Sequence, residues 1–259
     1  MRRSNGFTLI ELVVVIVLMS LISLAGVEVI RQSSQSYLKM SDRQALGSAA
    51  RFVIERMSRE LRSALPGSVR VSGVCVEYMP VKVAGAYFSA PIESASTSMT
   101  VVRVSTDLET ETGRIAIYPV GDDVYDSSSA ILSPDASIGA PSADNVSTIS
   151  WVGNHTFPFH SPTRRFYMID SPVSYCVDGE YLFRYTNYGI AAVQPVVVDL
   201  PTALPDRALL VNQVTGAVTP FSVAEAGLTR NAIVMLTLTF SAAGESIEVT
   251  HEAHLRNVP

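Results

Sequence analysis

The chain has few of the residues from which a recognisable active site is built. It contains four histidines, two cysteines and one tryptophan in 259 residues. No G-x-S-x-G, phosphate-loop or C-x-x-C pattern occurs, so common signatures of serine hydrolases, P-loop enzymes and thiol oxidoreductases are missing. His251 and His254 are three residues apart in an expected strand, so their side chains point to opposite faces. The sequence favours a protein that is not an enzyme and needs no cofactor.

Proline is absent from Phe7 to about Ala64. In the second half of this stretch, apolar residues recur at three- and four-residue spacing, which is the pattern of one helical face. They are Leu46, Ala50, Val53, Met57 and Leu61. Pro66 and Gly67 then favour an end to the helix. We expect one continuous helix without a marked kink, bare in its first half and packed on a domain in its second.

Charge is almost absent from the start of this helix. Only Glu11 is charged between Phe7 and Val27, and Arg2 and Arg3 precede the apolar run. A charge inside a bilayer costs about 2.5–3.5 kcal/mol, so an isolated carboxylate there indicates a function. A secretory signal peptide or a plain membrane anchor has the same basic and apolar order. However, no A-x-A cleavage site follows the run, and a plain anchor gives Glu11 no role.

No later stretch is long and apolar enough to span a membrane, so the sequence predicts a single pass. Arg2 and Arg3 favour a cytoplasmic N-terminus, which places the rest of the chain in the periplasm. Through Ala64 there are nine basic and five acidic residues, a charge of +4, and the remainder carries −9 of the total of −5. An acidic head argues against nucleic acid as its partner.

The segment Gly6-Phe7-Thr8-Leu9-Ile10-Glu11 resembles the processing site of type IV prepilins and type II secretion pseudopilins. The resemblance implies that a prepilin peptidase cuts after Gly6, that the new N-terminal Phe7 is methylated, and that Glu11 becomes the fifth mature residue. It also implies that Glu11 meets the N-terminal amine of a neighbouring subunit during assembly. Such a pairing would set the register, because an unpaired buried charge is costly.

After the helix, roughly 190 residues remain, which is enough for one globular domain with its own core. Short alternating or β-branched segments predict antiparallel strands. These segments are Val69–Tyr78, Met99–Val104, Arg114–Val120, Val146–Val152, Phe166–Ile169, Val173–Val177, Tyr181–Tyr185, Ala232–Phe240 and Glu245–Thr250. Gly121–Asn145 and Pro195–Pro205 are interpreted as irregular surface connections. The expected fold class is α+β, with a long N-terminal helix packed on a mainly antiparallel β head, as in pilins.

Further segments resemble MshO-type minor pilins of MSHA pilus biogenesis. They are Arg43–Leu46, Ala49–Arg56, Arg59–Arg62, Asp170–Gly179, Leu182–Tyr185 and Arg256–Pro259. The resemblance implies a low-abundance subunit that helps to initiate, assemble or cap a pilus. Its implied partners are other major and minor pilins and the inner-membrane assembly platform. A J-type minor pseudopilin of type II secretion is an alternative, and a membrane-anchored periplasmic enzyme or binding protein is another.

The resemblance divides the chain into four parts: a leader at 1–6, a transmembrane and polymerisation helix at 7–28, the amphipathic half of the same helix at 29–65, and a periplasmic β head at 66–259. The expected location is the inner membrane, with the N-terminus cytoplasmic, and then the pilus at the cell surface.

Two cysteines, Cys75 and Cys176, each fall in an expected strand. Free cysteines commonly pack as small buried hydrophobes. In an oxidising periplasm, a pair in separate strands is expected to form a disulfide instead.

Two polar clusters leave alternatives open. Asp122, Asp123 and Asp126 could bind calcium through several loop oxygens, although a solvated acidic loop has the same composition. The aromatic residues of segment 181–188 could form a sugar-binding or partner surface, or could simply pack across neighbouring strands.

Overall fold

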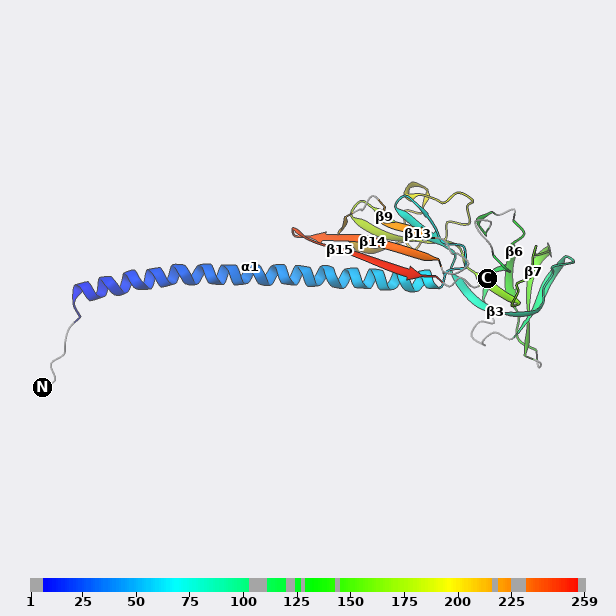
Figure 1. The fold of residues 1–259 in the computed structure, drawn as a ribbon, viewed down its shortest axis with the longest axis horizontal. Helices are drawn as coiled ribbons and strands as arrows, with labels where there is room; N and C mark the ends of the chain where they lie inside the picture. Colours follow the sequence, from blue (N-terminus) through cyan, green and yellow to red (C-terminus); the bar gives the residue numbers. More distant parts are fainter. Residues whose placement is uncertain are drawn as a thin grey trace.

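Figure 1 shows the computed structural model of the chain, with a long helix leading into a β-rich head. The structure describes residues 7–102, 111–119, 124–126, 129–142, 145–215, 219–224 and 232–255. The helix α1 (Leu9–Arg62) has 54 residues. At 1.5 Å per residue it is about 81 Å long. Its first half projects from the head as a bare rod (Figure 1).

The second half of α1 is fixed to the head by the apolar face expected from the sequence. Leu46, Ala50, Val53, Met57 and Leu61 are each 2% exposed or less. The helix is continuous through Gly26 and ends at Arg62, two residues before the expected end. The Ser63 hydroxyl donates a hydrogen bond to the Glu60 carbonyl at 2.7 Å, which satisfies one of the last helical acceptors.

Two antiparallel sheets pack against one side of this half of the helix (Figure 1). The first has the order β1-β2-β9-β10-β11, and the second has the order β12-β14-β13 with β15 paired to β14. The strands of the first are β1 (Arg70–Ser72), β2 (Cys75–Tyr78), β9 (Val173–Asp178), β10 (Tyr181–Tyr185) and β11 (Arg207–Asn212). Those of the second are β12 (Val214–Thr215), β13 (Phe221–Ala224), β14 (Ile233–Ala242) and β15 (Glu245–His254). Apolar side chains of both sheets form one core with the stripe of α1.

The remaining strands form a closed barrel at the far end of the head. Its order is β3-β4-β7-β6-β5-β8. The strands are β3 (Val81–Ser89), β4 (Ser96–Val102), β5 (Thr112–Ala116), β6 (Leu132–Ile138), β7 (Val146–His155) and β8 (Arg165–Ile169). Side chains such as Met99, Ile149 and Phe166 fill the interior. At Gly113, a Cβ atom would lie 2.3 Å from the Ile169 carbonyl oxygen, so glycine is needed for β5 to approach β8.

The barrel is inserted between two strands that pair directly with each other. β2 precedes it in the chain, β9 follows it, and Cys75 lies opposite Cys176 in the β2–β9 register. A further apolar cluster, which includes Leu65, Met79 and Tyr167, joins the barrel to the end of α1. The barrel therefore begins and ends at one place, beyond the C-terminal end of the helix (Figure 1).

The expected α+β class is confirmed, and each of the nine predicted strand segments overlaps at least one strand. The interpretation of Gly121–Asn145 as one surface loop is wrong, because Leu132–Ile138 forms β6 of the barrel. The strands β3, β11, β12 and β13 were not predicted. The β14–β15 turn is tight, with Ala243 and Gly244 at φ 51° and 82°, as a two-residue hairpin requires.

Candidate functional site

The first half of α1 is an apolar surface without protein cover. Phe7 is 77% exposed, and Leu9, Ile10 and Ile16 are each more than half exposed. In the part of the chain that the structure describes, α1 is the helix that is long and apolar enough to cross a membrane, judged by length and composition. So large an uncovered apolar surface requires lipid or another protein around it.

Between Phe7 and Ser23, the polar side chains make hydrogen bonds within the segment itself. The Glu11 carboxylate accepts from the Thr8 backbone N–H at 3.5 Å and from the Thr8 hydroxyl at 3.3 Å, which is a capping-box arrangement. The hydroxyls of Ser20 and Ser23 donate to the carbonyls of Val17 and Met19 at 2.8 and 2.7 Å. In an environment without water, polar groups must form their hydrogen bonds within the protein, as these side chains do.

The capping role of Glu11 was missed by the sequence interpretation, although Thr8-Leu9-Ile10-Glu11 has the T-x-x-E pattern of a capping box. Gly6, where cleavage is expected, lies outside the described residues, as does the rest of the leader. Glu11 follows Phe7 by four residues, or about one helical turn. A positive amine on Phe7 and the negative Glu11 carboxylate would attract each other at that separation.

A half-buried polar cluster fixes the end of α1 to the sheet. The Glu60 carboxylate accepts hydrogen bonds from the Tyr78 hydroxyl at 2.6 Å, from Arg184 Nε at 2.9 Å and from Arg56 Nε at 3.1 Å. Tyr78 belongs to β2 and Arg184 to β10, so one helical carboxylate connects two strands. Burial alone would raise the pKa of Glu60, but the hydrogen bonds from Tyr78 and Arg184 outweigh it and lower the pKa to about 2.

The lowered pKa predicts acid sensitivity of the head. A carboxylate whose pKa is about 2 when folded and 4.5 when unfolded contributes its full stability above pH 4.5 and loses it as the pH falls towards 2. The contribution is on the order of 2–3 kcal/mol. In urea denaturation between pH 2 and 7, Glu60→Gln should be less stable at pH 7 and should show a flatter profile below pH 4.5 than the original chain.

The matched control is Glu55→Gln on the same helix. Glu55 pairs with Arg59 at 2.7 Å, and both side chains are more than 70% exposed, so its removal should leave the pH profile unchanged. If Glu60→Gln keeps the slope of the original chain below pH 4.5, Glu60 is not the titrating group.

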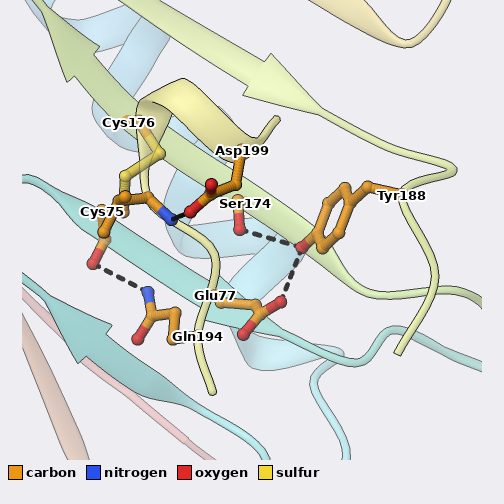
Figure 2. The surroundings of a disulfide bond; sticks show 8 residues. Cys75, Glu77, Ser174, Cys176, Tyr188, Gln194 and Asp199 are labelled. Carbon is orange, nitrogen blue, oxygen red and sulfur yellow. Dashed lines mark hydrogen bonds between the residues drawn. A yellow bond between two sulfur atoms is a disulfide. The ribbon is translucent and has the colours of Figure 1, made fainter. Parts of the chain in front are cut away.

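The second anchoring site surrounds the disulfide, which is present between Cys75 and Cys176. Figure 2 shows the bridge on adjacent strands, beneath the segment that carries Gln194 and Asp199. The Gln194 side-chain amide donates to the Cys75 carbonyl at 3.2 Å. Leu200 from the same segment is buried in one apolar cluster with both cysteines. The segment Pro195–Pro205 is the irregular connection predicted, apart from one short 3-10 turn at Val197–Asp199.

Beside the bridge, Glu77 is fully buried and contacts Arg70. The Tyr188 hydroxyl donates to Glu77 at 2.9 Å and lies 2.8 Å from the Ser174 hydroxyl (Figure 2). Burial raises the pKa of Glu77, and the contact with Arg70 opposes that rise. Each polar group here has a partner from the head itself, so this site serves to hold the sheet together.

The other candidate residues do not assemble into a chemical site among the described residues. Asp126 is exposed, whereas Asp122 and Asp123 lie outside the described residues. Within the described ranges, no group of three or more His, Cys, Asp or Glu side chains is arranged to hold a metal ion. Of the aromatic cluster, Tyr185 is buried and Phe183 is covered by the Arg207 guanidinium at 3.7 Å, so packing accounts for both.

Comparison with known proteins gives one result. Residues 1–27 match the family model described as the prokaryotic N-terminal methylation motif. This range contains Gly6, Phe7 and Glu11 together with the uncovered start of α1. No curated protein and no solved structure matches the chain significantly. The methylation motif, the candidate membrane-spanning helix and the antiparallel β head together support a membrane-anchored, type IV pilin-like protein with a structural role.

Proposed function

We propose that the chain is a minor pilin that is processed after Gly6 and takes part in the initiation, assembly or tip of a type IV pilus. One observation carries the proposal. The apolar stretch from Phe7 to Val27 holds a single carboxylate, Glu11, one turn after Phe7, inside a segment that matches the N-terminal methylation motif. An anchor alone needs no such carboxylate, whereas a subunit that pairs with a neighbour does.

The proposed mechanism follows the chain from its start. A prepilin peptidase removes residues 1–6 on the cytoplasmic side, and the amine of Phe7 is methylated. In the inner membrane, residues 7–28 hold the subunit while residues 66–259 fold in the periplasm. During assembly, Glu11 of the incoming subunit pairs with the Phe7 amine of a neighbour, because both charges are costly if left unpaired in an apolar core. Residues 29–65 connect this fibre core to the head.

The size of the head is the reason for proposing a low-abundance, minor subunit. The barrel of β3–β8 enlarges it at the end remote from the membrane helix (Figure 1). A subunit with so large a head fits a rare position in a thin fibre better than dense repetition. The resemblance of separate segments to MSHA minor pilins agrees with that position, with other pilins and the inner-membrane assembly platform as partners.

A minor pseudopilin of type II secretion is the second candidate. The features of α1 that carry the proposal suit a secretion pseudopilus equally well, because both assemblies require the same helix and processing site. Neighbouring genes for pilus or for secretion machinery would separate the two candidates.

Processing is the direct test of the proposal. Intact-mass analysis of chain extracted from membranes should find a protein that begins at methylated Phe7. A Gly6→Ala variant should keep its leader, because a side chain at the cleavage site hinders the close approach of a peptidase. Gly26→Ala is the matched control, since a Cβ at Gly26 has nothing within 4 Å, and it should be processed normally. A mature chain that retains residues 1–6, or one cut after Ala25, contradicts the assignment.

A further inference from the structure

A groove lies where the end of α1 meets the outer surface of the barrel. Its volume is about 820 Å³, within the range of ligand pockets. Its lining includes Arg62 and Ala64 from the end of the helix, Ala84 and Ala86 of β3, and Arg165 of β8. The groove is remote from the apolar half of α1 and from the disulfide, so neither site described above uses it.

The register of β3 and β8 explains the shape of the groove. Ala84 lies opposite Tyr167, and Ala86 lies opposite Arg165. Side chains alternate along a strand, so Ala84 and Ala86 share the outer face while Val83 and Tyr87 point into the barrel core. Two methyl groups in place of larger side chains leave the outer face of β3 hollow beside the helix end.

The groove carries unneutralised positive charge. Arg62 and Arg165 are exposed, and neither side chain forms an ion pair or a hydrogen bond with any described residue. Four other arginines of the head form ion pairs: Arg70 with Glu77, Arg114 with Asp135, Arg184 with Glu60 and Arg207 with Asp178. No Asp or Glu lines the groove. It is therefore a basic site on a head that is acidic as a whole.

We propose that this groove binds an acidic polypeptide segment of a neighbouring subunit, whose carboxylates form ion pairs with Arg62 and Arg165. The proposal rests on the proposed function, which supplies neighbouring subunits. Guanidinium groups bind carboxylates through paired N–H donors, which gives both charge and geometry. The small side chains of Ala84 and Ala86 leave room for an extended main chain.

Two observations favour a peptide carboxylate over other occupants. The aromatic residues that line the groove, Phe166 and Tyr167, are 0% and 8% exposed, so neither offers a ring face on which a sugar could stack. The charged side chains that line the groove are the guanidinium groups of Arg62 and Arg165, whose paired N–H donors match the planar carboxylate group. Recognition in the groove therefore depends on the two charged side chains.

Alanine-methyl NMR of the full chain in detergent micelles locates binding directly. Ala64, Ala84 and Ala86 line the groove, whereas Ala50 and Ala253 are buried in the core between helix and sheet. Titration with a hexaglutamate peptide should shift the three groove methyls in a saturable way and leave Ala50 and Ala253 unmoved. The apparent affinity should weaken as salt is added, because the contacts are exposed ion pairs.

Two double variants with the same change of charge test the role of the arginines. R62Q/R165Q should weaken hexaglutamate binding at least tenfold. R59Q/R164Q is the matched control, because each of its positions is close in sequence to a groove arginine but lines no part of the groove. Arg59 pairs with Glu55, and Arg164 donates to the Phe88 carbonyl. Binding to the control should change less than twofold.

Three results would overturn the inference: no shift of the groove methyls with hexaglutamate, equal weakening in both double variants, or shifts with tetragalacturonate but not with the peptide. The last result would assign the groove to an acidic saccharide. R62Q/R165Q should still be processed to Phe7 in cells. A leader retained in the original chain would contradict the proposed function while leaving the peptide-binding result intact.

Discussion

Replacing Glu11 with valine is expected to reduce incorporation into the pilus at least tenfold while the head stays folded and the leader is still removed. The carboxylate lies far from the head along α1, so its loss does not touch the core. Membrane insertion should become easier without the charge. In the fibre, however, the amine of the neighbouring Phe7 would be buried without a counter-charge, and such a loss costs about 3–5 kcal/mol.

The test uses cells that lack the native copy. Folding of the head is followed by protease resistance, processing by intact mass, and assembly by counting surface fibres. Glu11→Gln separates the two roles of the side chain, because glutamine can still accept the hydrogen bonds from Thr8 but carries no charge. If charge pairing sets the register, both variants fail to assemble.

Two outcomes would contradict the proposal that charge pairing by Glu11 sets the register. Normal fibre numbers with a stable, processed Glu11→Val chain would leave the segment as a simple anchor. Normal assembly of Glu11→Gln beside failure of Glu11→Val would show that Glu11 serves as the helix cap alone. Glu55→Gln, a carboxylate of the exposed helix surface, is the control and should assemble normally.

The sequence predicted the helix well because a single strong pattern runs along it. Apolar residues recur at helical spacing from Leu46 to Leu61, and no proline interrupts the chain before Pro66. Each member of that stripe is buried in the structure. The disulfide was also predictable, because only two cysteines exist and both fall in clear strands.

The barrel was harder to predict, because two of its strands break the usual β pattern. In β6, Pro134 removes a backbone donor and Asp135 is exposed, so the segment resembles a loop. Ala136 and Ile138 nevertheless alternate towards the barrel interior, whereas Leu132 packs in the cluster between the barrel and the end of α1. In β3, the run Ala84-Gly85-Ala86 has little β propensity, and pairing with β8 decides its structure.

The basic groove could not have been found from the sequence. Arg62 ends the helix and Arg165 begins β8, with most of the barrel between them in the chain. Only the insertion of the barrel between β2 and β9 brings them to one surface. Neither arginine belongs to a motif, so the information lies in the tertiary arrangement.

Removal of the disulfide should have the largest effect on stability of any substitution in the head. The Cys75–Cys176 bridge spans 101 positions, and the closed loop contains the entire barrel. In the chain-entropy account, closing so long a loop restricts the unfolded chain by about 4.7 kcal/mol, and native proteins commonly lose about 2–5 kcal/mol without such a bond. Cys75→Ala/Cys176→Ala should therefore unfold at a clearly lower urea concentration.

Trp151 makes this loss measurable within the barrel itself. It is the single tryptophan of the chain, is 6% exposed, and packs edge-on against Phe157 at 6.1 Å between ring centroids. Its fluorescence reports the barrel, whereas circular dichroism in the far ultraviolet also reports α1 and both sheets. If the bridge acts by restricting the unfolded chain, the double variant should shift both transitions to lower urea, and chemical reduction of the original chain should match it. An unchanged midpoint for both probes would mean that the pairing of β2 with β9 holds the base of the barrel without the covalent bond.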